Sequence, residues 1–121
     1  MSDESGPEIQ IVSVKDAPAV VFGDPPAMKS HRLIRRDMGS KRVSLHFTVT
    51  EQTSEEFDSV YPDNDELMYI ISGVGEIWWE GSERKTVSAG MAIFIPQGRL
   101  YRYRVIEAPQ EAVVVFGPAY S

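Results

Sequence analysis

The chain has 121 residues, 42% of them hydrophobic, with a net charge of −6 and no cysteine. Its length and composition are typical of one globular domain. The absence of cysteine excludes disulfide bonds, thiol nucleophiles, zinc fingers and iron–sulfur clusters. Its acidity disfavours contact with a phosphate backbone, so we expect no nucleic-acid partner. No apolar run approaches the roughly 20 residues that cross a bilayer, and the N-terminus lacks the layout of a signal peptide, so we expect a cytoplasmic protein without a membrane partner.

Short runs of β-branched and aromatic residues, separated by turn residues, predict many short strands. They follow a polar tail over residues 1–8 that we expect to be disordered, and residues 9–121 are expected to form a single domain. The predicted strands cover residues 9–14, 19–22, 31–36, 42–50, 66–72, 76–80, 84–88, 91–95, 100–106 and 111–116. Because no segment carries a sustained helical period, the predicted fold class is all-β, a sandwich or a barrel.

Two connections between these strands are predicted from their residue types. The segment Gly73-Val74-Gly75 is predicted to be a hairpin turn between the strands on either side of it. The polar stretch from Glu51 to Asp65 is predicted to be a long loop. Its acidic residues lack the ordered spacing of a calcium-binding loop, so we expect them to be solvated.

The segment from residue 42 to 50 alternates strictly between apolar and polar residues. Leu45 and Phe47 belong to its apolar face, and His46 belongs to its polar face. If the apolar face lines the interior, His46 points away from it, and we expect this histidine to be exposed or at an interface. The other histidine, His31, lies beside Arg32 in a basic stretch, which makes it a poor ligand for a cation.

Two further segments resemble the conserved motifs of the cupin superfamily. In the first, Glu66 is followed by six residues and then Gly73. In the second, Gly90 is followed by five residues and then Pro96-Gln97-Gly98. The resemblance covers about residues 42–117 and implies a double-stranded β-helix, the jelly-roll cupin barrel.

The sequence departs from the cupin motifs at the metal ligands that the resemblance implies. Ser59 and Tyr61 stand at the positions of two family histidines, and Tyr101 stands at the position of the third. Only Glu66 remains of the usual three histidines and one carboxylate. Phenols, with a pKa of about 10, are poor substitutes for imidazole at neutral pH, so we expect neither a metal nor another cofactor.

The motif positions and strand alternation together predict a cavity. Glu66, Tyr101 and Tyr61 are the candidate catalytic residues, because a carboxyl in an apolar cavity can act as a general base and a phenol can donate a hydrogen bond to a developing enolate or alkoxide. Arg99, beyond the second motif, could bind a substrate carboxylate through two hydrogen bonds. The candidate substrate-binding residues are Ser59, Met68, Ile70, Trp79, Arg99 and Tyr103.

The resemblance implies a small-molecule cupin that catalyses metal-independent acid/base chemistry, as an isomerase, cyclase or lyase, on an apolar or aromatic metabolite that can carry a carboxylate. Two alternatives stay open: a non-catalytic binding or sensor module, and a divergent metalloenzyme that uses Glu66 with tyrosine or aspartate ligands. Because small cupins expose sheet edges, we also expect a homodimer, with the predicted strand 9–14 crossing to the partner subunit.

Overall fold

The computed structural model describes residues 7–23 and 28–121, which form an all-β fold with two short 3-10 helices. The helices are η1 (Val14–Asp16) and η2 (Arg36–Met38). The strands are β1 (Ala19–Phe22), β2 (Met28–Ile34), β3 (Ser44–Thr50), β4 (Phe57–Ser59), β5 (Asp65–Trp78), β6 (Lys85–Val87), β7 (Ala92–Ile95) and β8 (Tyr101–Gly117). The predicted all-β class is therefore confirmed. Within the described residues, neither helix has the length and apolar character that crossing a membrane requires.

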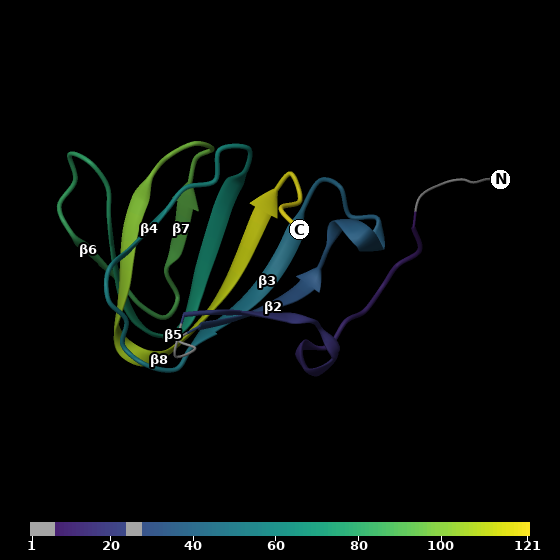
Figure 1. Ribbon diagram of the computed structural model, residues 1–121, viewed down its shortest axis with the longest axis horizontal. Coiled ribbons are helices and arrows are strands. Elements are labelled where there is room, and N and C mark those ends of the chain that lie inside the picture. Colours follow the sequence, from purple (N-terminus) through teal and green to yellow (C-terminus); the bar gives the residue numbers. More distant parts are fainter. Residues whose placement is uncertain (1–6, 24–27) are drawn as a thin grey trace.

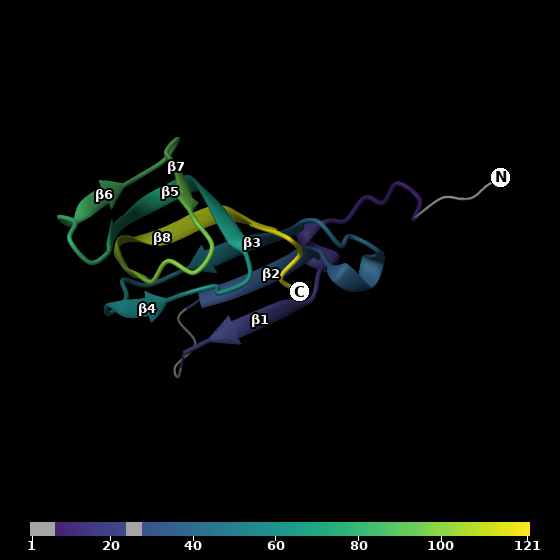
Figure 2. The ribbon, with the colours of Figure 1, turned by 90° about the horizontal axis from the view of Figure 1, so that it is seen from above.

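The two longest strands, β5 and β8, run antiparallel along almost their whole length and take part in two layers (Figures 1 and 2). The second half of β8 lies between β3 and the first half of β5, with β2 and β1 beyond β3 and with β7 beside β5. The first half of β8 lies between β4 and the second half of β5, with β6 beyond. The two layers of this jelly roll enclose the core.

The hairpin turn predicted at Gly73-Val74-Gly75 is wrong, because β5 continues through these residues. The register with β8 shifts here, as in a β-bulge. Gly73 has a φ of +79°, and a Cβ atom on it would lie 2.5 Å from the carbonyl oxygen of Pro109. A Cβ atom on Gly75 would collide with the hydroxyl group of Tyr103. These glycines therefore let β8 pass close to β5 rather than turn the chain.

Other strand predictions also differ from the structure, and the predicted strand 31–36 begins within β2 and ends in η2. Residues 9–14, predicted as a strand, form no strand; most of them are exposed, and Gln10 Nε2 donates a hydrogen bond to Met38 O in η2. The ranges 100–106 and 111–116, predicted as separate strands, are one strand, β8. The predicted loop contains β4, which pairs with β8 over three residues. Of the tail predicted over residues 1–8, residues 1–6 lie outside the described residues.

The polar face of β3 lines the interior, contrary to the prediction that the apolar face does so. Ser44, His46 and Thr50 are buried, whereas Leu45 and Phe47 are partly exposed on the outer face. Two of these polar groups have partners inside the protein: the Ser44 hydroxyl accepts a hydrogen bond from a backbone N–H, and His46 Nε2 lies 2.9 Å from a serine hydroxyl. Because these groups are satisfied, burying them is not costly.

Candidate functional site

A cavity of about 460 Å³ lies between the two layers, and we refer to it as the interlayer cavity. One wall is formed by β2, β3, the first half of β5 and the second half of β8, and the other by β4 and the first half of β8. The side chains on these walls that bear most on its chemistry are Arg32, His46, Tyr61, Glu66, Tyr101 and Gln110.

Glu66 and Tyr101 face each other across this cavity. Glu66 lies on β5 and is 3% exposed, and Tyr101 lies on β8 and is 4% exposed. The Tyr101 hydroxyl donates a 2.8 Å hydrogen bond to Glu66 Oε1. Burial raises the pKa of Glu66 to about 7, and the hydrogen bond from Tyr101 partly offsets this rise. Near neutral pH, Glu66 is therefore present both as a carboxylate and as a carboxylic acid, so it can accept or release a proton.

The phenols of Tyr101 and Tyr61 serve as hydrogen-bond donors at neutral pH. Burial raises the pKa of both hydroxyls above the ordinary value, and the charge of Glu66 raises it further. The Ser59 hydroxyl lowers both pKa values in part. Ser59 pairs with Tyr101 in the β4–β8 register, so this serine belongs to the same cluster of hydroxyl groups.

Most of the site residues that were predicted from the sequence lie together at the interlayer cavity. Tyr103 lies at the wall of the interlayer cavity, where its hydroxyl donates a 2.7 Å hydrogen bond to Gln110 Oε1. Ile70 belongs instead to the hydrophobic core and has no exposed surface. The predicted residues that line the cavity are Ser59, Tyr61, Glu66, Met68, Tyr101 and Tyr103. Their roles in catalysis and substrate binding stay predictions.

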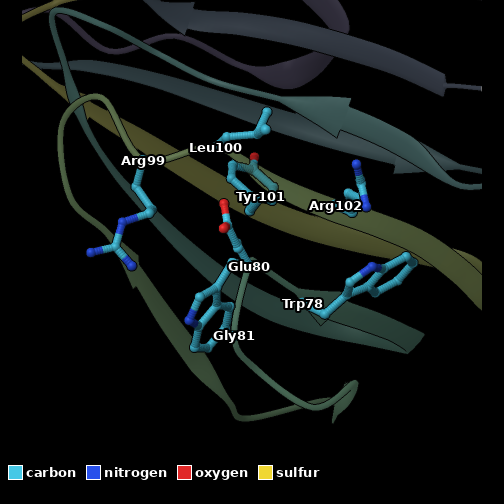
Figure 3. Close-up of a pocket in the computed structure, with 8 residues that line it drawn as sticks. Trp78, Glu80, Gly81, Arg99, Leu100, Tyr101 and Arg102 are labelled. Atoms are coloured by element: carbon cyan, nitrogen blue, oxygen red, sulfur yellow. The ribbon is translucent and has the colours of Figure 1, made fainter.

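Trp79 and Arg99 line a second hollow, of about 770 Å³, rather than the interlayer cavity. Figure 3 shows Arg99 on one side of this hollow and Trp78 with Arg102 on the other. Arg99 and Arg102 are both exposed. Arg99 therefore does not line the cavity that contains Glu66, and its binding of a substrate carboxylate stays a prediction.

The residues of the interlayer cavity that were not predicted from the sequence include His46 and Arg32. The prediction that His46 is exposed or at an interface is wrong, because it is only 3% exposed and faces the cavity. Its Nε2 atom lies 2.9 Å from Ser121 Oγ. Burial, together with the charge of Arg32, lowers the pKa of His46 to about 4, so the ring is neutral at pH 7. The alternation in β3 correctly separated His46 from the apolar face, but periodicity alone does not predict which of the two faces lines the interior.

A family model described as "Cupin domain" matches residues 45–116, more than half of the chain. The chain belongs to the cupin family. This confirms the resemblance inferred from the two motifs, and with the observed strand arrangement it confirms the jelly-roll cupin barrel.

Solved cupin structures superpose on this cupin over most of its length. KdgF from Halomonas sp. is 14% identical, with coverage of 90% of this chain and 94% of that chain and a TM-score of 0.75. Ectoine synthase from P. lautus is 22% identical, with coverage of 91% and 78% and a TM-score of 0.77. The polyketide cyclase RemF from Streptomyces resistomycificus is 19% identical, with coverage of 92% and 80% and a TM-score of 0.74. At these identities the likeness shows the fold alone. A search of curated protein sequences finds no match.

The donor atoms of this cupin do not fit the metal site that its family implies. Ser59, Tyr61 and Tyr101 supply hydroxyl groups instead of imidazoles, and burial raises the pKa of both phenols, so they stay protonated at neutral pH. Protonated phenols are poor ligands for a transition metal. Within residues 7–23 and 28–121, no three side chains of the histidine, cysteine, aspartate or glutamate type are grouped so that they could hold a metal ion.

Proposed function

We propose that this cupin binds a small, partly apolar metabolite in the interlayer cavity and catalyses a metal-independent proton transfer on it, of the isomerase, cyclase or lyase type. The observation that carries the proposal is the buried hydrogen bond from Tyr101 to Glu66 at the interlayer cavity, where the pKa of the carboxyl is about 7. A general acid or base is most effective when its pKa lies near the working pH.

In such a reaction, Glu66 can transfer the proton and Tyr101 can stabilise the developing negative charge. Glu66, as the carboxylate, removes a proton from a carbon atom next to a carbonyl group. Once Glu66 holds this proton, it no longer needs the Tyr101 hydroxyl as a donor, and the hydroxyl can instead donate to the oxygen on which negative charge develops. Glu66 then returns the proton to a different atom in an isomerisation, or to a departing hydroxyl group in an elimination. Tyr61 is available as a second donor.

Other proteins of the same fold support an enzymatic role. RemF is described as a polyketide cyclase and a second neighbour as ectoine synthase. The likeness to them is one of fold, so the proposal takes from them the general kind of role and takes its residues from the geometry of the interlayer cavity.

Deuterium incorporation tests the proposal with a mixture of metabolites, so that no single substrate has to be chosen. The purified protein is incubated in D₂O with the small-molecule extract of its source cells, and mass spectrometry follows which metabolites gain deuterium or disappear. We expect the wild-type protein to change at least one metabolite, the chelator-treated protein to behave in the same way, and Glu66→Gln to be inactive. Arg42→Gln, at an exposed arginine that lines neither the interlayer cavity nor the second hollow, is the matched control and should stay active.

Three outcomes would contradict the proposal. Activity that survives in Glu66→Gln would remove the proposed base. Activity that disappears on chelation and returns with added metal would favour the metalloenzyme alternative. A metabolite that is bound and released unchanged, with equal affinity for the wild type and Glu66→Gln, would favour the non-catalytic binding module.

A further inference from the structure

Arg32 places a positive charge at the interlayer cavity that the chemistry of Glu66 and Tyr101 does not use. It lies on β2, opposite His46 in the β2–β3 register, and lines the cavity in a partly buried position. Its Nε atom donates a 2.9 Å hydrogen bond to the hydroxyl of Ser30, which is itself 2% exposed. This bond fixes the orientation of the guanidinium group at its inner edge.

The guanidinium of Arg32 has no anionic partner among residues 7–23 and 28–121. Over the same residues, its Nε atom makes a hydrogen bond, but the two terminal nitrogens make none. Within the part of the chain that the structure describes, ion pairs are formed by Arg35, Arg84, Arg102 and Arg104. A charge that is withdrawn from water without a partner is costly, and burial lowers the pKa of Arg32 accordingly. An anion bound at the two terminal nitrogens would offset this cost.

Neither acidic residue on the cavity wall supplies that anion. Glu66 accepts its hydrogen bond from Tyr101 instead. Asp58 forms an ion pair with Arg102, with a distance of 3.0 Å from Arg102 Nε to Asp58 Oδ1. The positive charge of Arg32 and the proton acceptor Glu66 therefore line the same cavity without neutralising each other.

Aromatic rings lie between the two groups. Tyr61 packs against Phe116 at a centroid distance of 4.6 Å and against Tyr120 at 5.0 Å. The pKa of the Tyr61 hydroxyl is raised by Glu66 and lowered by Arg32, so this residue is within electrostatic reach of both. The guanidinium carbon of Arg32 lies 6.0 Å from the centroid of the Tyr120 ring. A planar ligand body on these rings can thus extend from Arg32 toward Glu66.

The single positive charge of Arg32 at this end of the cavity is complementary to a ligand group with one negative charge. His46, the neighbour of Arg32, is neutral at pH 7 because burial holds its pKa at about 4. A doubly charged phosphate ester would therefore meet only one positive charge. A guanidinium group and a carboxylate are matched both in charge and in geometry, through two parallel hydrogen bonds.

We propose that Arg32 binds the carboxylate of the substrate, and that this substrate is a small organic acid with a planar or aromatic body. The inference rests on the proposed function for its cavity and names the substrate class of that same site. Ser30 is a positioning residue, because it holds the Nε edge of Arg32 and leaves the terminal nitrogens for the ligand.

Equilibrium binding to the wild-type protein gives the first test. Titration calorimetry compares benzoate with benzamide, which has the same ring and no charge, and with phenyl phosphate. We expect benzoate to bind about 10- to 100-fold more tightly than benzamide, as a charge-assisted pair of hydrogen bonds provides. No measurable binding of benzoate, equal affinities for benzoate and benzamide, or tighter binding of phenyl phosphate would each overturn the proposal.

Variants then assign the effect to Arg32. Arg32→Gln should weaken benzoate binding about 10- to 100-fold and leave benzamide binding unchanged, and Arg32→Lys should retain part of the affinity. Arg42→Gln, at an exposed arginine that lines neither hollow, should match the wild type. Benzoate binding that is unchanged in a folded Arg32→Gln protein, or lost in Arg42→Gln, overturns the assignment. If Arg32→Gln does not fold, the decision rests on Arg32→Lys, whose benzoate affinity must fall below that of the wild type.

A further variant separates this inference from the proposed function. Glu66→Gln should still bind benzoate, because Arg32 is intact. If benzoate binding depends on Arg32 but the protein shows no proton-transfer activity, the carboxylate site is supported and the proposed function is contradicted. Proton transfer on an uncharged metabolite, with no dependence on Arg32, would support the proposed function and contradict the carboxylate site at Arg32.

Discussion

The Tyr101 hydroxyl lies 2.8 Å from Glu66 Oε1, although the two residues are 35 positions apart in the sequence. They come from opposite layers: Glu66 lies in the half of β5 that pairs with β7, and Tyr101 lies at the start of β8, beside β4. The hydrogen bond therefore depends on the alignment of the two layers, and it is also the central feature of the proposed chemistry.

Tyr101→Phe removes the phenol and keeps the ring. We expect turnover to fall about 100- to 1000-fold, as when one donor to a developing oxyanion is lost, whereas stability should fall by only about 1 kcal/mol. Because the hydrogen bond from Tyr101 lowers the pKa of Glu66, this pKa should rise above its wild-type value of about 7. Carbon-13 NMR of the Glu66 carboxyl group measures this change directly.

Tyr103→Phe is the matched control for this substitution. Tyr103 is also 4% exposed and also donates a buried hydrogen bond, to Gln110. We expect a similar loss of stability, but neither a comparable loss of turnover nor a change in the pKa of Glu66. Equal turnover in Tyr101→Phe and the wild type would show that the Tyr101 hydroxyl is structural.

The stability of this protein should depend on pH through two opposing groups. Glu66 has a folded-state pKa of about 7, above its ordinary value of 4.5. Its contribution to stability is therefore present below pH 4.5 and is lost as the pH rises to 7. His46 has a folded-state pKa of about 4, below its ordinary value of 6.5, so its contribution increases as the pH rises from 4 to 6.5. Each slope is about 1.4 kcal/mol per pH unit, and they largely cancel where they overlap.

If Glu66 or His46 is replaced, the pH dependence of stability that is due to the other residue should become visible. The free energy of unfolding, measured in urea between pH 4.5 and 6.5, should increase with pH in Glu66→Gln and decrease with pH in His46→Gln. The charge of Arg32, which faces His46, and the phenol of Tyr101, which faces Glu66, stay in place in both variants. Profiles parallel to that of the wild type would show that these residues do not titrate as described.

The sequence was sufficient for the fold and for the two residues at the centre of the site. The resemblance of the motifs around Glu66 and Gly90 to those of the cupins implied the jelly roll that the structure has. The mistaken turn at Gly73 has a physical reason, since glycine serves tight turns and close backbone contacts equally well. Only the position of Pro109 on the neighbouring strand distinguishes the two uses.

The second half of the site could not be predicted in the same way. Period-2 alternation in β3 assigned Leu45 and His46 to opposite faces, but both faces of this strand can be covered, and the hydrogen bond to Ser121 that satisfies His46 comes from the far end of the chain. In the sequence, Arg32 is one residue of a basic stretch. Its position in the cavity depends on the pairing of β2 with β3, which local sequence does not specify.

Gly75→Ala tests the close contact between β5 and β8. Its Cβ atom would collide with the Tyr103 hydroxyl, which donates to Gln110. Displacing this ring should cost about 1–3 kcal/mol in the free energy of unfolding, measured by urea denaturation. Gly117→Ala is the control, because the nearest contact of its Cβ atom, with Arg42 O, is an ordinary 3.5 Å. Equal stability of the two variants would contradict the assigned role of Gly75.

The outer surface of β5 and β7 carries exposed apolar side chains, which we call the outer apolar face: Leu67, Tyr69, Ile71 and Phe94. Leu67 lies opposite Phe94 in the β5–β7 register, so these two side chains adjoin. An uncharged apolar surface is complementary to its own copy under two-fold symmetry, and contiguous apolar patches often mark interfaces. We propose that the expected homodimer forms through this face. Residues 9–14, predicted to cross to the partner subunit as a strand, form no strand within this chain.

Light scattering of the wild type and of two matched leucine variants tests this interface. Leu67 is 48% exposed on the outer apolar face, and Leu100 is 47% exposed at the second hollow, so both substitutions add a charge at equally accessible positions. We expect the mass of a dimer for the wild type and for Leu100→Glu, and the mass of a monomer for Leu67→Glu, because a carboxylate facing its own copy is both desolvated and repelled. A monomeric wild type at micromolar concentration would contradict the homodimer. A dimeric Leu67→Glu would instead place the interface elsewhere on the surface, and unchanged unfolding curves would confirm that each variant reports on association rather than on folding.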